Sequence, residues 1–185
     1  MKSVTVLALA ALVAGLTGAR ARAQTATAPV LKAAFLLNLA KFVEWPADVV
    51  PAGGPITLCV SGDPAVAEPL ADSVKGHTIE DHPLAVRRLA ANDGALRGCQ
   101  LLYMSGLDAP RTAKLIESLA GVAIFTVSDL DRFAQTGGVA QLFVDGDRLR
   151  FAINVDAAQR ARLRLSSKLL SLARIVRDEH NAALP

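Results

Sequence analysis

Cysteine, aromatic residues and long apolar runs are all scarce in this 185-residue sequence. Its two cysteines are too few for a disulfide-framework miniprotein, and aromatic residues make up only 4% of the chain. No stretch reaches the about 20 consecutive apolar residues that a membrane-spanning helix needs. A glycine-rich dinucleotide fingerprint, a phosphate-binding loop and a G-x-S-x-G nucleophile motif are also absent from the sequence. We therefore expect no enzyme active site and no cofactor.

Apolar residues are abundant instead, at 52% of the chain. Such a sequence is too apolar to be disordered, and its length suits one domain with a sizeable core. No internal repeat or low-complexity linker divides it. We predict a single folded domain.

The first 23 residues are typical of a secretory signal peptide. Lys2 supplies the positive start, residues 4–16 form an apolar run, and Ala21 and Ala23 give the small-x-small cleavage pattern. A short membrane anchor is the alternative, but the run is too short to span a bilayer as a helix. We predict export and cleavage after Ala23, leaving residues 24–185 as the mature chain with a domain core at about 30–177.

The formal net charge of +3 belongs entirely to that first segment. Without Lys2, Arg20 and Arg22, 17 basic residues balance 17 acidic ones. No basic block or basic stripe interleaved with aromatic residues remains, so nucleic-acid binding is not expected. Membrane insertion of the mature chain is not expected either, because polar residues interrupt its most apolar segment, residues 28–45.

Two helices stand out in the mature chain. A mainly apolar helix is expected at residues 28–45, with Pro29 in its first turn and Pro46 beyond its end. The chain is expected to close with a second helix that presents its apolar residues on one face at helical spacing. Those residues are Leu165, Leu169, Leu172 and Val176.

Between these helices, strand-like segments alternate with helical ones, which implies crossover connections and a largely parallel sheet. Asp145 and Gly146 separate two strand-like segments and favour a tight hairpin. We predict an α/β fold: a single domain with a mainly parallel or mixed sheet of five to six strands, helices on both faces and a C-terminal edge hairpin. The expected strands are 56–60, 84–89, 99–104, 122–127, 139–144 and 148–153.

Cys59 and Cys99 both lie in apolar strand-like segments. In the cytosol such residues would most often be buried free thiols, whereas export to an oxidising compartment favours a disulfide between them. Their spacing does not match a C-x-x-C redox motif. We therefore predict a structural disulfide rather than catalytic thiols.

Two aspartates follow predicted parallel strands, where the active sites of α/β proteins usually lie. Asp63 and Asp129 also each precede a helical segment, and the helix expected after Asp129 is a short one at Arg132 and Phe133. An N-cap role explains both carboxylates without chemistry. We predict that they are structural caps.

The remaining candidates have ordinary structural explanations. His77 and His82 lack helical metal-ligand spacing and are predicted to lie in a solvated loop rather than a metal site, and His180 stands alone in the tail. Phe42 and Trp45 could belong to a binding surface, but core packing is the favoured interpretation. We predict no metal site and name no partner-binding residue.

Seven segments together resemble the YfiR-like family of exported proteins, and they cover the chain from about residue 30 to 175. The most specific are the KAAFLLNLAKFVEWP stretch that begins at Lys32 and the succession from FAQTGG to FAIN. The segments are KAAFLLNLAKFVEWP (32–46), ITLCVSGD (56–63), GCQLLY (98–103), FTVSD (125–129), FAQTGG (133–138), RFAIN (150–154) and SSKLLSLA (166–173).

This resemblance implies a periplasmic repressor of a membrane-bound diguanylate cyclase or related sensor protein. Such a repressor binds the periplasmic domain of its partner and lowers cyclic-di-GMP signalling and biofilm formation. Cys59 and Cys99 occupy positions like those of the family's main cysteine pair, and a second pair found in some members is absent. The alternative hypothesis is a periplasmic small-ligand-binding module that serves a receptor or transport complex. A secreted hydrolase would need a nucleophile and base that the sequence does not offer, and homodimerisation is left open.

Overall fold

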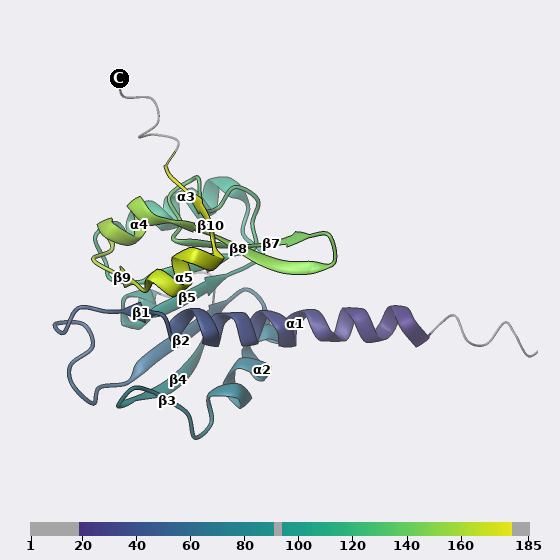
Figure 1. The fold of residues 1–185 in the computed structure, drawn as a ribbon, viewed down its shortest axis with the longest axis horizontal. Helices are drawn as coiled ribbons and strands as arrows, with labels where there is room; N and C mark the ends of the chain where they lie inside the picture. Colours follow the sequence, from purple (N-terminus) through teal and green to yellow (C-terminus); the bar gives the residue numbers. More distant parts are fainter. Residues whose placement is uncertain (1–18, 91–93, 179–185) are drawn as a thin grey trace, which may run out of the picture.

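The computed structural model describes residues 19–90 and 94–178, and these form one α/β domain (Figure 1). Its centre is a mixed eight-stranded sheet, accompanied by a small two-stranded antiparallel sheet. The predicted fold class is therefore confirmed. The helices are α1 (Ala19–Ala40), α2 (Pro64–Val74), the 3-10 helix η1 (Gly94–Gly98), α3 (Ala109–Ser118), α4 (Val155–Arg160) and α5 (Ser167–Leu172). The strands are β1 (Val43–Glu44), β2 (Ile56–Ser61), β3 (Thr78–Ile79), β4 (His82–Leu89), β5 (Leu101–Met104), β6 (Phe125–Ser128), β7 (Ala140–Asp145), β8 (Arg148–Asn154), β9 (Arg164–Leu165) and β10 (Arg174–Val176).

The order of the strands places a change of direction at the centre of the large sheet. The order is β10-β8-β7-β6-β5-β2-β4-β3, and β4, β2, β5, β6 and β7 are all parallel. After β2 the chain passes through α2 to β4 on one side, and then returns to β5 on the other side of β2. Because this change of direction lies between β2 and β5, the carboxyl ends of these two strands flank the switch point of the sheet.

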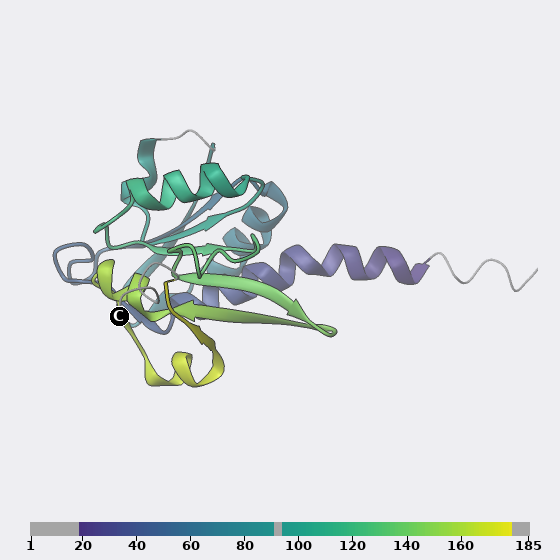
Figure 2. The ribbon, with the colours of Figure 1, turned by 90° about the horizontal axis from the view of Figure 1, so that it is seen from above.

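Both faces of the sheet are covered, as the sequence predicts. Along β5, Leu101 and Tyr103 pack into a large core with α1 and α2, whereas Leu102 and Met104 pack into a smaller core with α3. This alternation follows from the two-residue period of a strand. Figure 2 shows α3 lying along the sheet on the other side from α1. The central strands read as continuous apolar runs because both of their faces are buried.

Helix α1 differs from its predicted bounds at both ends. It begins at Ala19, so Pro29 lies inside the helix rather than in its first turn. It ends at Ala40, because Val43 and Glu44 leave the helix and form β1, which pairs with β9. None of the helices among residues 19–90 and 94–178 has the length and apolar character needed to cross a bilayer. Most of the predicted signal peptide, residues 1–18, lies outside the described residues.

The predicted hairpin exists, but it does not lie at the sheet edge. Strands β7 and β8 pair antiparallel across the turn at Gly146. Outside them, β10 pairs in parallel with β8, placing Arg174 beside Ala152. The hairpin is therefore internal, because the end of the chain adds one more strand to the open side of β8.

The predicted closing helix is wrong as a single element. Leu165 belongs to β9, α5 covers only six residues, and Val176 belongs to β10. Helix α5 ends where Ala173 adopts an extended conformation. At residues 174–176, backbone hydrogen bonding to β8 outweighs the helical spacing of the apolar side chains. The sheet exceeds the predicted five to six strands because β3 and β10 have only two and three residues, too few to show a periodic pattern.

Candidate functional site

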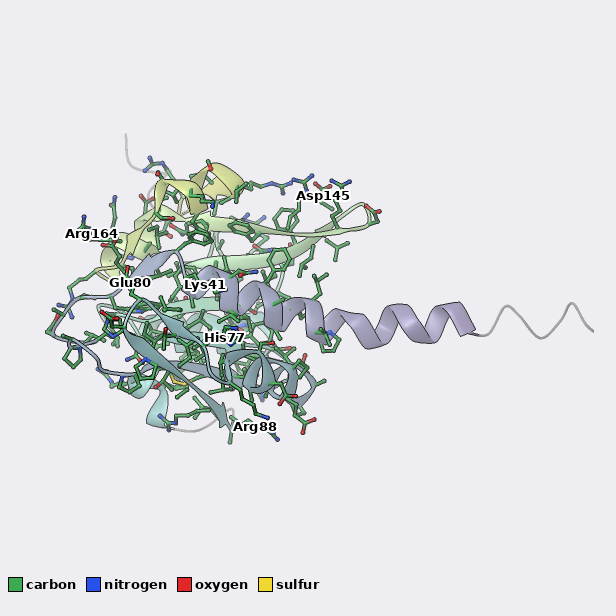
Figure 3. The ribbon with its side chains drawn as sticks, turned by 60° about the horizontal axis from the view of Figure 1, so that its bottom comes forward. Lys41, His77, Glu80, Arg88, Asp145 and Arg164 are labelled. Atoms are coloured by element: carbon green, nitrogen blue, oxygen red, sulfur yellow. A yellow bond between two sulfur atoms is a disulfide. The ribbon has the colours of Figure 1, made fainter. Side chains whose placement is uncertain are left out.

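Cys59 and Cys99 form a disulfide that joins two neighbouring strands of the sheet. Cys59 lies within β2, and Cys99 lies two residues before β5, with Cα atoms 5.8 Å apart. Because β2 and β5 are adjacent and parallel, the fold itself places the two cysteines at bonding distance. The bond therefore joins the two strands between which the chain changes direction, near the amino end of β5, and a yellow link marks it among the side chains in Figure 3.

The disulfide is buried in the smaller core, between the sheet and α3. Cys59 and Cys99 are 0% and 1% exposed, respectively. Around them lie apolar side chains from β4, β5 and the 119–133 region, including Leu102 and Phe133. A reductant in solution cannot reach the sulfur atoms without local opening of this core. The arrangement favours a structural bond over a freely exchanging one.

Asp63 occupies the capping position that the sequence predicts. It is the N-cap of α2, and its Oδ1 accepts a hydrogen bond from the backbone N–H of Ala65 at 3.1 Å. Pro64 follows in the first helical position. The capping interpretation of Asp63 is therefore confirmed.

Asp129 is not a helix cap, and this prediction is wrong. The residues after it form a turn rather than a helix, and Ser128 supplies the local side-chain oxygen by accepting from the N–H of Leu130 at 3.1 Å. The Asp129 carboxylate instead accepts a hydrogen bond from Lys32 Nζ of α1 at 2.6 Å. This pair spans 97 residues of sequence, so no local pattern could have predicted it.

Tyr103 completes a small polar cluster with Lys32 and Asp129. Its hydroxyl donates to Asp129 Oδ2 at 3.2 Å. Burial, reinforced by the negative charge of Asp129, raises the pKa of Tyr103 to about 12. Burial alone would lower the pKa of Lys32, but its hydrogen bond and charge attraction to Asp129 hold that pKa above its ordinary value. The cluster therefore consists of a neutral phenol and an ion pair that tie α1 to the sheet, and it contains no nucleophile poised for catalysis.

His77 and His82 lie at the β3–β4 edge of the molecule. His77 is exposed, as predicted for a solvated loop, but His82 starts β4 and its Nδ1 lies 2.8 Å from the carbonyl oxygen of Gly54. His82 is therefore half-buried in a strand and not in a loop. His180 lies outside the described residues. Within the described part of the chain, no group of three or more His, Cys, Asp or Glu side chains could hold a metal ion.

Phe42 and Trp45 both contribute to the large core, as the favoured interpretation predicts. Trp45 is also held by a hydrogen bond from its Nε1 to the carbonyl oxygen of Gln100 at 2.9 Å. The Lys168 ammonium lies 5.6 Å from the centre of the Phe42 ring. Both aromatic side chains are therefore half-buried and packed against the core.

The exposed large apolar side chains of the described chain lie on four elements, α1, β7, α5 and β10. We call this set the α1–hairpin surface. Helix α1 contacts β8 through an edge-to-face pair of Phe35 and Phe151, with ring centres 6.4 Å apart. Strand β10, which follows α5, pairs with β8. The members of the surface are Val30 (54% exposed) and Leu31 (46%) on α1, Val144 (72%) on β7, Leu172 (66%) on α5 and Ile175 (46%) on β10.

Two of the elements that carry the α1–hairpin surface extend from the body of the molecule. Helix α1 and the β7–β8 hairpin extend in the same direction in both ribbon views (Figures 1 and 2). Asp145 lies near the hairpin tip (Figure 3), next to the exposed Val144 and in an ion pair with Arg150. Exposed large apolar residues mark protein-binding surfaces when they form a contiguous patch. The sequence did not reveal this surface, because its members lie within segments that otherwise predict core strands and helices.

A comparison with known protein families identifies a relationship. A family model described as YfiR/HmsC-like matches residues 29–174. The match begins inside α1 and ends at the first residue of β10. It therefore includes the disulfide, the polar cluster at Asp129 and nearly all of the sheet.

Proposed function

The chain belongs to the YfiR/HmsC-like family, and we propose that it is a periplasmic regulatory binding protein that inhibits an inner-membrane diguanylate cyclase. It would bind the periplasmic sensor domain of that enzyme and so lower cyclic-di-GMP. The family match over residues 29–174 is the observation that carries the proposal. The sequence pattern of residues 1–23, with cleavage after Ala23, supports the periplasmic location.

The proposed mechanism needs binding energy and no chemical step. An inhibitor that binds the inactive form of its partner more tightly than the active form shifts the partner toward the inactive form. The α1–hairpin surface offers exposed apolar area for such binding, and Val144 is its most exposed member. Family membership likewise supports a regulatory rather than an enzymatic role. We propose this surface as the contact with the sensor domain.

Gene deletion with complementation tests the function. Deleting the gene in its host should raise cellular cyclic-di-GMP, measured by mass spectrometry, and restoring the wild-type gene should lower it again. A chain carrying Val144→Glu should fail to restore low cyclic-di-GMP, because a charge placed within an apolar contact is costly to bury. Thr78→Glu is the matched control, since Thr78 is exposed on β3 at the opposite edge of the sheet.

The possible results of these experiments test the proposed function and the proposed contact surface separately. Unchanged cyclic-di-GMP after deletion would contradict the proposed function. Full complementation by Val144→Glu would contradict the proposed surface alone. A pull-down from membranes with the tagged exported protein should recover the cyclase with the wild type and the Thr78→Glu variant, and lose it with Val144→Glu.

A further inference from the structure

The outer edge of β4 has no strand beside it along most of its length. Strand β3 pairs with β4 only at His82 and Pro83, whereas β2 pairs with the inner edge of β4 at residues 84–89. In the described part of the chain, no other strand lies on this side of the large sheet. Residues 84–89 therefore form an open edge, and Arg88 lies near its end at the margin of the molecule (Figure 3).

The two-residue period of a strand identifies the open backbone groups. His82 faces β3, because it pairs with Ile79 across a two-residue turn. Alternate residues of a strand direct their N–H and C=O groups to the same side, so those of Val86 and Arg88 face away from β2. On that side, neither backbone has a hydrogen bond to a described residue. An unpaired edge of this kind accepts the backbone of another extended chain.

Arg87 projects from the sheet face opposite α2. Arg88 forms an ion pair with Glu68 of α2 at 3.5 Å, and successive side chains of a strand point to opposite faces. The 3-10 helix η1 lies beside Arg87, because a Cβ on Gly98 would come 3.1 Å from Arg87 Nη1. Arg87 is exposed and has no acidic partner among residues 19–90 and 94–178.

The Arg87 face carries an excess of positive charge. Arg97 of η1 adds a second arginine there, and Asp93 is the one acidic residue in the segment 83–98. Even with Asp93 assigned wholly to this face, one positive charge remains. The charge therefore favours a carboxylate from outside the chain at this position.

The other charges near β4 do not alter this balance. On the α2 face, Glu68 and the capping Asp63 accompany Arg88, so that face has no excess of positive charge. Glu80 and Asp81 lie at the opposite end of β4, about 20 Å from the arginines at 3.3 Å per residue. A second copy of the chain would bring further arginines to the edge, and like charges on paired strands are destabilising.

We propose that the open edge of β4 binds an extended segment of a partner protein, which adds an antiparallel strand to the sheet and places a carboxylate opposite Arg87. Val86 and Arg88 exchange backbone hydrogen bonds with that segment. Arg87 lies between them at a non-hydrogen-bonded position, where opposing side chains are closest. The β7–β8 hairpin lies toward the other edge of the sheet, so the proposal does not depend on the proposed inhibition.

The synthetic peptide TTEVTV, acetylated at its N-terminus and labelled with a fluorophore at its C-terminus, tests the backbone pairing. In the antiparallel register its glutamate lies opposite Arg87 and its first valine opposite Val86. Fluorescence polarisation with the exported, disulfide-bonded protein should show saturable binding. N-methylation of that valine, whose N–H faces β4, should abolish binding. N-methylation of the threonine after it, whose N–H faces solvent, should change the affinity by less than about twofold.

The two N-methylated peptides separate backbone pairing from simple charge attraction, because both keep the glutamate. Equal affinities of the two peptides would overturn the proposal. The absence of saturable binding at up to about 1 mM of the unmodified peptide would overturn it as well.

A charge exchange tests the register. Arg87→Glu should weaken binding of TTEVTV at least about threefold and should favour TTKVTV, in which lysine replaces the glutamate. Binding of the lysine peptide also shows that the variant is folded. Arg148→Glu is the matched control, because it reverses an exposed arginine on β8 and should leave both affinities unchanged. Binding of TTEVTV that is insensitive to Arg87→Glu would refute the placement.

A proline in β4 tests whether the edge serves a partner or a second copy. Val86→Pro removes an outward N–H and spares the groups that bond to β2, and proline is tolerated on edge strands. It should weaken TTEVTV binding at least about tenfold. Dimerisation of the peptide-free protein, seen by sedimentation and lost in Val86→Pro, would assign the edge to a second copy and overturn the proposal.

Discussion

The contribution of the Cys59–Cys99 bond to stability can be predicted from the structure. Two perturbations separate the cross-link from the packing of its atoms. Reduction of the wild-type protein opens the bond and keeps both sulfur atoms in place. The double substitution Cys59→Ala and Cys99→Ala opens the bond and also removes two buried sulfur atoms from the smaller core.

The expected magnitude follows from the length of chain that the bond closes. The two cysteines are 40 residues apart, and the chain-entropy model gives about 4 kcal/mol for a closed segment of that length. For a folded domain of this size, such a loss lowers the melting temperature by about 8 to 16 °C. The double variant should lose about 1 kcal/mol more than the reduced protein, because the alanines leave part of the buried space unfilled.

Urea unfolding of the three forms, followed by the fluorescence of the chain's one tryptophan, measures these differences. Intact-mass analysis must first show that reduction adds the mass of two hydrogen atoms to the wild type. Because both cysteines are buried, the reduction rate should rise with urea in step with opening of the core. A free-energy difference below about 1 kcal/mol between the oxidised and reduced wild type would refute the entropic argument. A reduction rate independent of urea would refute the claim that the core protects the bond.

Two further predictions concern the polar groups around the sheet. Tyr103 is the chain's one tyrosine, and its raised pKa of about 12 means that the folded state holds the proton more tightly than the unfolded chain. Its contribution to stability is therefore present below about pH 10 and lost as the pH rises toward 12, and Asp129→Asn should lower the tyrosinate midpoint seen by ultraviolet absorbance; an unchanged midpoint would refute the role of Asp129. Asp63→Ala removes the cap of α2 and should cost about 1 kcal/mol in urea unfolding, whereas Asp72→Ala, exposed within the same helix, should stay within about 0.5 kcal/mol. Equal losses in the two variants would show that the cap does not stabilise α2.

The fold class could be predicted because its strongest signals are local. The strand around Cys59 and the helix capped by Asp63 follow from apolar runs and capping chemistry that a few adjacent residues encode. The tight turn at Gly146 is local in the same sense. The structure of residues 174–176 could not be predicted, because it depends on pairing with β8, which comes from another part of the chain. These residues continue the helical spacing of apolar side chains in the sequence, yet they pair with the free edge of β8 and form a strand.

In the candidate site, too, local interactions could be predicted from the sequence and long-range ones could not. Asp63 was predictable because its partner lies two residues away. Asp129 was not, because its partner Lys32 comes from α1 and meets it only in the folded protein. The exposure of Val144 was likewise invisible, since an apolar residue at the end of a strand looks the same in sequence whether it faces a core or solvent.

The bond between β2 and β5 also sets how far the molecule can be stretched. Residues 59–99 form a closed ring that contains α2, β3, β4 and η1. A force applied to the two ends of the chain passes through the bond and bypasses the ring. At about 3.5 Å per extended residue, the 40-residue segment holds back about 140 Å of chain. A machine that unfolds proteins by pulling can therefore extend the oxidised protein only to this shortened length, until a reductant opens the ring.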